Sequence, residues 1–232
     1  MKTIAIIAAM PGELKALLKQ DAGWSASTAP NGLKLWRLRR NQVELVAVAG
    51  GMGTASATRA LATVESSVAS LDGIVSLGWA GATTARCQLG KAYCAHGIIN
   101  QQTGERYLCT HGEADLWVVT SPKVADEPEK LRLAASYGAS LVEMEAAALA
   151  RLAEMRDLPF VAVKGVSDGL GSKLPDFNRF AAPDGSLRMV AFVAHVLVRP
   201  WYWSGLIRMG RASSTSAHAM AQIVLDICCK KE

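Results

Sequence analysis

Strand-length apolar runs alternate with helical segments along this chain, and five of the runs are followed by a glycine-rich or acidic turn. The turns begin at Met10, Gly50, Gly78, Glu143 and Asp168. Strands that alternate with helices predict a mixed or parallel sheet covered by helices on both faces. In such sheets the carboxyl ends of the strands line the ligand crevice. The turns therefore predict one small-molecule site assembled from across the chain.

The composition bounds the class of protein. With 232 residues, of which 50% are hydrophobic, the chain is expected to form one α/β domain with a substantial core. The net charge of +5 includes no long Lys/Arg block, so no nucleic-acid partner is expected. The five cysteines show no CxxC pair or metal-ligand spacing, which predicts a reduced, cytoplasmic protein without a metal. Residues 189–198 form an apolar run of about half a membrane span, so no transmembrane helix is expected.

The turn at Glu143 places two carboxylates around Met144, between a buried strand and a good helix former. Buried carboxylates are costly unless something binds them. A helix start is the simpler explanation, because acidic side chains meet the positive end of the helix dipole there. The spacing alone favours the helix start over a ligand site.

Two other turns have the composition of ligand-binding loops. The turn 10–13 precedes a helix whose free N–H groups can bind an anion, with Glu13 and Lys15 at its mouth. The turn 50–53 is glycine-rich, which permits positive φ and close approach of a ligand to the backbone. Its later spacing does not match the dinucleotide fingerprint, so a dinucleotide enzyme is set aside.

The turns share their motifs and their order with a known family. The motifs are AIIAAM (5–10), GMG (51–53), GWAG (78–81), VEMEAAA (142–148) and VSD (166–168). Together they resemble the purine and uridine nucleoside phosphorylase superfamily, which includes methylthioadenosine/S-adenosylhomocysteine nucleosidase. The resemblance implies a nucleoside phosphorylase-like domain over residues 1–198, a three-layer α/β sandwich with a central mixed sheet, plus a C-terminal helical extension of the same domain over 199–232.

The resemblance also implies an activity and its participants. The family cleaves the N-glycosidic bond of nucleosides. The substrate expected here is a purine nucleoside whose base is adenine. No cofactor is implied, with phosphate as the one co-substrate to consider. The protein is expected to act as a homo-oligomer on a small-molecule nucleoside.

The same resemblance assigns roles to single residues. Asp168 matches the acid that protonates the leaving purine, a role that needs an enclosed, apolar setting to keep its proton to near neutral pH. Glu145 matches the carboxylate that accepts hydrogen bonds from the ribose hydroxyls. The other residues assigned to the substrate are Met144 and Met52 beside the sugar, Trp79, which can stack on a base or close the phosphate pocket, and Ser167 next to the acid.

The attacking group stays open between water and phosphate. Glu13 falls at the position of the glutamate that orients a water in the nucleosidases. The pair Pro11-Gly12 instead resembles the phosphate turn of the phosphorylases, with Lys15 in place of its arginine and Gly53 as a further phosphate contact. Against phosphate, Ser76 stands where bacterial purine phosphorylases usually hold an arginine.

A protein that binds a nucleoside or a lipid-linked nucleoside without catalysis is the rival to an enzyme. Ser76 and Trp79, which both depart from the family pattern, keep this rival open. Glu13, Glu145 and Asp168 occur together, however, and binding alone has little need for all three. Their retention favours the enzyme.

The segment after Val198 is unusual for the family. Pro200 is expected to end one helix and begin another. A helical hairpin packed on the domain or on a second subunit is the simpler explanation. The aromatic residues with Arg208 and Arg211 also suit contact of residues 199–211 with a membrane surface or a lipid-bearing substrate. That alternative resembles the hopanoid-associated nucleoside phosphorylases, which implies adenine release from a lipid-linked adenosyl substrate in hopanoid biosynthesis.

Overall fold

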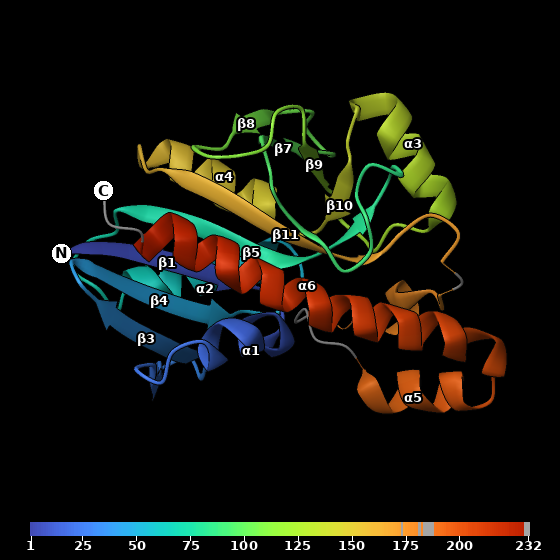
Figure 1. Cartoon of the computed structure of the whole chain (residues 1–232), viewed down its shortest axis with the longest axis horizontal. Coiled ribbons are helices and arrows are strands. Elements are labelled where there is room, and N and C mark those ends of the chain that lie inside the picture. The colour runs from blue at the N-terminus through green and yellow to red at the C-terminus, as the bar shows by residue number, and fades with distance from the viewer. Residues whose placement is uncertain (173, 181, 183–187, 230–232) are drawn as a thin grey trace.

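The computed structural model describes residues 1–172, 174–180, 182 and 188–229, and Figure 1 shows the course of the chain. The strands are β1 (Lys2–Ala8), β2 (Ser25–Thr28), β3 (Lys34–Arg40), β4 (Val43–Ala49), β5 (Gly73–Ala82), β6 (Ala92–Cys94), β7 (Gly97–Asn100), β8 (Arg106–Leu108), β9 (Trp117–Thr120), β10 (Leu141–Glu143) and β11 (Phe160–Asp168). The helices are α1 (Pro11–Lys19), α2 (Thr54–Glu65), α3 (Glu127–Tyr137), α4 (Ala146–Met155), α5 (Met189–Leu197) and α6 (Trp203–Cys229), with short 3₁₀ helices η1 (Phe177–Phe180) and η2 (Pro200–Tyr202).

The strands form one mixed sheet, as predicted. Among the described residues this sheet has 11 strands. Its apolar centre is parallel: β1 pairs with β4 on one side and with β5 on the other, and β11 pairs with β5. Beyond that centre β10 runs antiparallel to the end of β5, placing Val142 opposite Gly81. Asp168 is also in register with Gly81, on β11, so two of the predicted site segments meet at the end of β5.

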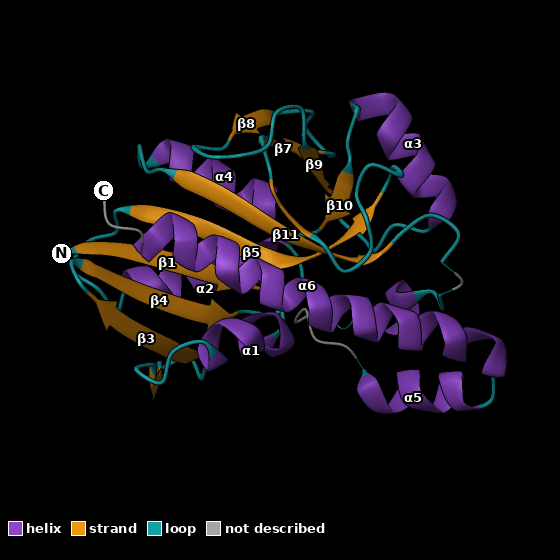
Figure 2. Ribbon diagram, viewed as in Figure 1, coloured by secondary structure: helices purple, strands orange, loops and turns teal. Residues whose placement is uncertain are grey.

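Helices cover both faces of the sheet (Figures 1 and 2), which confirms the predicted three-layer sandwich. The layer formed by α1 and α6 packs on Ile6 and Ala8 of β1, whereas the layer formed by α2 and α4 packs on Ala5 and Ile7. Successive side chains of a strand point to opposite faces, so an entirely apolar β1 serves both layers. Every one of these four side chains is buried.

The last helix is part of the same domain, because half of it packs in the domain core. Helix α6 runs for 27 residues, and its second half packs on β11 and α1. Met220 is fully buried there with Ala217, Ala221 and Val224. Gly165 of β11 permits this contact, since an added Cβ would lie 2.7 Å from Ser216 Oγ. The second half of α6 is therefore joined to the sheet by buried apolar side chains.

The first half of α6 and all of α5 project beyond the sheet (Figure 1). None of the residues of α5 is buried. Over the described residues, no single helix is long and apolar enough to cross a membrane. The segments 189–197 and 200–229 reach that length and composition only together, and they are bent by 105° at the break around Pro200.

The predicted turn at Gly78 is wrong, because β5 continues to Ala82. Both glycines in this part of the strand make room for other side chains. A Cβ on Gly78 would lie 3.0 Å from Glu13 Oε1, and a Cβ on Gly81 would lie 2.8 Å from Lys130 Cε. The small residues of the GWAG motif thus admit polar side chains from neighbouring elements to the face of β5.

Candidate active site

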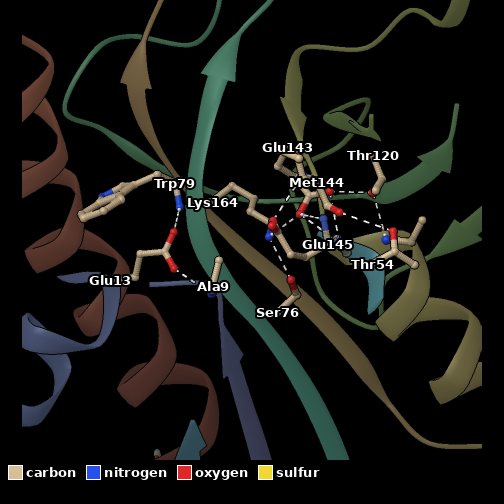
Figure 3. A network of polar contacts seen from close by, with 12 residues as sticks. Ala9, Glu13, Thr54, Ser76, Trp79, Thr120, Glu143, Met144, Glu145 and Lys164 are labelled. Carbon is tan, nitrogen blue, oxygen red and sulfur yellow. Dashed lines mark hydrogen bonds and ion pairs between the residues drawn. The ribbon is translucent and has the colours of Figure 1, made fainter. Parts of the chain in front are cut away.

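Polar side chains from several elements converge on the second half of β5 (Figure 3). Glu13 of α1 accepts a hydrogen bond from Trp79 N. On the neighbouring strand β11, Lys164 donates to Ser76 Oγ, and Ser167 Oγ donates to Ala80 O at 3.3 Å. The sequence predicted a site built from separate strand ends, and β5 is the element that connects them.

Glu13 is almost fully buried and its carboxylate is held by three backbone N–H groups. Its Oε2 accepts from Ala9 N and Met10 N, each at 2.8 Å, and its Oε1 accepts from Trp79 N at 2.8 Å. Burial raises the pKa of Glu13, and the backbone hydrogen bonds oppose this effect. Glu13 therefore has a structural role beyond the first turn of α1. It links that turn to β5.

Glu143 and Lys164 form a buried ion pair at the centre of the network. Lys164 Nζ lies 2.9 Å from Glu143 Oε2, and both side chains are at most 2% exposed. Thr120 Oγ1 donates to Glu143 Oε1, and Ala146 N donates to Oε2 at 2.9 Å. Sequence analysis missed Lys164, although a single lysine in an otherwise β-branched apolar run was a signal. Its ammonium group lies beside Ser76, the position where an arginine was expected in phosphorylases.

Glu145 joins two of the predicted turns. Its Oε1 accepts from Gly53 N at 2.7 Å, and Gly53 has the positive φ of 89° that its glycine permits. Burial raises the pKa of Glu145 to about 8, and the charges of Glu143 and Glu13 add to this rise. Met52 and Met144, the methionines assigned to the sugar, are half-buried on the two turns that this bond connects.

Asp168 ends β11 and is held by two side chains. Lys130 Nζ of α3 donates to Asp168 Oδ2, and Ser167 Oγ donates to Oδ1 at 2.8 Å. The side chain of Lys130 is 5% exposed and that of Asp168 is 17% exposed. The purely apolar setting expected for this acid is therefore absent, since an ammonium group touches it. The hydroxyl group of Ser167 is hydrogen-bonded to Asp168 and to the backbone and does not point into open space.

Lys130 was overlooked because its segment, residues 122–137, has the composition of a charged outer helix. The usable signal was its place on the same helix face as Leu133, three residues on, which is also buried. Arg179, on the segment that follows β11, is exposed. The cation that contacts Asp168 is Lys130.

A cavity of about 590 Å³ opens beside Asp168. This volume lies within the range of small-molecule sites. Its walls come from Asp168, Lys130, the loop before α3, and the segment that follows β11. Asn178 closes one side, since its side chain both donates to Val124 O and accepts from Val124 N, each at 2.9 Å. Glu13 and Glu145 are not among the lining residues.

The side chain of Trp79 does not face the polar network around Glu143, Glu145 and Lys164. Figure 3 shows its indole directed away from Glu145, on the opposite side of β5. Its Nε1 donates to Ser213 O of α6 at 3.0 Å, and its ring lies over α1 so closely that a Cβ on Gly12 would be 2.9 Å from it. This packing between two helices gives no support to stacking on a base.

The three residues assigned to phosphate lie in three different surroundings. Gly12 lies beneath Trp79, Gly53 gives its N–H group to Glu145, and Lys15 is exposed on α1. The structure therefore does not show them assembled around one anion. Across the described part of the chain, no group of three His, Cys, Asp or Glu side chains is placed to hold a metal ion.

Comparisons with known proteins agree with the fold. The chain resembles methylthioadenosine/S-adenosylhomocysteine nucleosidase of Campylobacter jejuni, with a TM-score of 0.71 and 17% identity over 98% of this chain and 99% of that one. Futalosine hydrolase of Helicobacter pylori gives a TM-score of 0.68 and 15% identity over 96% and 95%. S-adenosylhomocysteine nucleosidase of Streptococcus pyogenes gives 0.64 and 22% identity over 72% and 84%.

The extent of these matches bears on the C-terminal segment. A likeness over 98% of this chain includes α6, so the last helix belongs to the shared fold. Among curated proteins, no sequence match is found. The model of the phosphorylase superfamily matches residues 3–123 and 116–198, which is most of the chain. The chain therefore belongs to the phosphorylase superfamily of enzymes.

Proposed function

We propose that this protein cleaves the N-glycosidic bond of an adenine nucleoside. The observation that carries the proposal is Asp168, held by Lys130 and Ser167 at the wall of the 590 Å³ cavity. A purine leaves poorly as an anion, so its departure requires a proton on a ring nitrogen. A carboxyl group held at a cavity wall by two side chains is positioned to pass a proton to a base bound in the cavity.

In this mechanism the base occupies the cavity and the proton moves from Asp168 to the purine. As the bond between the ribosyl carbon and the base breaks, its electron pair stays with the base, which leaves neutral. Lys130 holds Asp168 in position, and the proton that the attacking water releases restores the acid after each turnover. The ribose becomes cation-like in the transition state, and the nearby carboxylates stabilise that charge.

Glu145 is proposed to hold the ribose. An ionised carboxylate can accept hydrogen bonds from both ribose hydroxyls while keeping the bond from Gly53 N. Since burial raises the pKa of Glu145 to about 8, the hydroxyl donors of a bound ribose are needed to favour the charged form at neutral pH. Met52 and Met144 would supply the apolar contact with the sugar.

Water is the attacking group that the arrangement supports better. Glu13 accepts three backbone hydrogen bonds, and a carboxylate has about four acceptor sites, so one remains to orient a water molecule. The residues assigned to phosphate have other partners or lie exposed. Phosphate stays the second candidate, because Lys164 brings a buried ammonium group to Ser76.

The substrate is proposed to carry an apolar group at its 5′ position, with a lipid-linked adenosyl compound of hopanoid biosynthesis as the specific candidate. The named solved structures include nucleosidases for methylthioadenosine, whose 5′ group is small, and a futalosine hydrolase. The exposed apolar helix α5 supports a larger apolar group in this chain. The cytoplasmic location and the homo-oligomeric state stay predictions, and light scattering on the purified protein tests the latter.

Release of free adenine is the direct test. Adenosine, methylthioadenosine and an adenosine with a long 5′ alkyl chain are incubated with the protein, with and without phosphate, and the sugar product identifies the attacking group. Asp168→Asn is expected to lower the rate by about 10²–10⁴-fold. Asp176→Asn is the control, because Asp176 is exposed on the same cavity. Tight nucleoside binding without release under any condition would instead identify a non-catalytic binding protein.

A further inference from the structure

Helix α5 exposes an apolar face that nothing in the described chain covers. Met189, Val190, Val193 and Leu197 are between 45% and 87% exposed. At about 100° per residue, these positions fall within roughly 100° of the helix circumference. They form one continuous apolar stripe along α5. Such a stripe is unfavourable in water and indicates a surface that another phase or molecule covers.

The opposite side of α5 is anchored, so the stripe cannot turn inward. Phe192 stacks on Phe177 of η1 with ring centroids 5.3 Å apart. His195 contacts Phe180 edge-on at 5.1 Å and stacks on Tyr202 at 6.3 Å. These aromatic contacts fix the rotation of α5 about its own axis. The apolar stripe is held facing away from the domain.

The apolar surface continues through the break between α5 and α6. Val198, Trp201, Trp203 and Ile207 are each between 46% and 69% exposed. Trp203 Nε1 donates to Val196 O at 2.9 Å, which orients its indole. Tryptophan is favoured at the boundary between water and lipid, where its ring is buried and its polar edge stays paired.

The charges on the segment that carries this surface have one sign. Residues 188–225 contain no Asp or Glu but four arginines. Arg188, Arg208 and Arg211 are exposed, and none of the ion pairs found among the described residues includes them. Exposed cations beside an apolar, aromatic surface are typical of helices that lie in the interface of an anionic membrane.

We propose that α5 and the residues that follow it, 198–207, dock on an anionic lipid surface. A symmetric dimer over the same surface is disfavoured, because it would bring the arginines of one copy toward those of the other. A membrane-spanning hairpin is disfavoured as well, since the second half of α6 is buried in the domain core around Met220. The hairpin therefore lies on the membrane and does not cross it.

This docking would place the candidate active site next to the lipid. Phe177 stacks on Phe192 of α5 and also lines the cavity that holds Asp168. A nucleoside with a long apolar 5′ group could then enter the cavity while its chain stays in the bilayer. This last step rests on the proposed function, whereas the docking itself does not.

Vesicle flotation tests the docking without any nucleoside. The full chain is mixed with vesicles of phosphatidylcholine alone or of phosphatidylcholine with phosphatidylglycerol. Binding is expected only to the anionic vesicles and is expected to weaken as salt rises. The double variant Val190→Asp/Leu197→Asp should bind at least about tenfold more weakly. The matched control is Leu131→Asp/Met155→Asp, which changes two other exposed apolar residues, on α3 and α4, and should bind like the wild type.

Two further measurements keep the outcomes distinct. Circular dichroism and adenine release from soluble methylthioadenosine should be unchanged in the α5 variant, which shows that loss of binding is not loss of folding. The docking is overturned if the α5 variant floats as well as the wild type. It is also overturned if neither binds vesicles and light scattering shows a wild-type dimer that the α5 variant abolishes. A protein that binds vesicles but releases no adenine would refute the proposed function alone.

Discussion

Lys130 of α3 and Asp168 of β11 form an ion pair at the wall of the cavity, 38 residues apart in the sequence. Gly81 of β5 makes the pair possible, since its missing side chain leaves room for both. A helix that looks solvent-facing in the sequence thus contributes a buried cation to the candidate acid. The pair fixes the position of the carboxylate at the end of its strand.

Replacing Lys130 by Met should lower kcat for adenine release by about 10–100-fold, because Asp168 loses the group that holds it in position. KM should change much less, since Lys130 is not assigned to the ribose. Lys130→Arg, which keeps the charge, is expected to recover part of the rate. Equal kcat values for the wild type and Lys130→Met would refute the positioning role.

Gly81→Ala should break the same pair without altering either charged residue. An added Cβ would lie 2.8 Å from Lys130 Cε and 3.2 Å from Asp168 Oδ2. The rate of adenine release is expected to fall by about tenfold or more, as with Lys130→Met. Gly73→Ala is the matched control on the same strand, because the nearest atom to its Cβ would be at 3.5 Å. Loss of activity in both variants would point to a general effect on β5.

Lys164→Met should destabilise the fold by about 3–5 kcal/mol, because it leaves Glu143 buried without its cation. Urea unfolding of the variant measures this change in the free energy of unfolding. Adding Glu143→Gln should recover part of the loss, since the second change removes the unpaired charge. A single variant as stable as the wild type would show that the pair contributes nothing to stability.

The fold and several site residues were predictable because they depend on local pattern. The apolar run of β1, buried on both faces, indicates a central strand before any contact is known. The turns that carry Glu145 and Asp168 likewise follow from the strand-to-helix pattern and from motifs read in order. These are features of short segments, where neighbouring residues determine the structure.

The remaining features depend on contacts between distant segments. Lys130 is charged and lies in a charged helix, and only its pairing with Asp168 reveals that it is buried. Trp79 was assigned to the substrate, but Ser213 of α6, which lies 134 residues further on, provides the acceptor for its indole. The glycine at position 78 suggested a turn, whereas β5 continues there in register with β11, and Glu13 occupies the space beside the glycine. No local sequence pattern encodes these contacts between distant segments.

The carboxyl group of Glu145 should make stability depend on pH. Burial raises its pKa to about 8 in the folded protein, from a value near 4.5 in the unfolded chain. Between these two values the folded state keeps a proton that the unfolded state has lost, so the free energy of unfolding should fall as pH rises through this window and level off above about 8.

Urea unfolding of Glu145→Gln, followed from about pH 5 to about pH 9, checks this prediction. The variant has no carboxyl group to titrate at this position, so its stability should fall less over that range than that of the wild type. Glu154→Gln, at an exposed position on α4, the helix that begins after Glu145, should leave the wild-type slope unchanged. KM for the nucleoside should also fall in the wild type as pH rises toward about 8, because the ionised carboxylate accepts both ribose hydroxyls. A wild-type slope that persists in Glu145→Gln would assign the titration to another group.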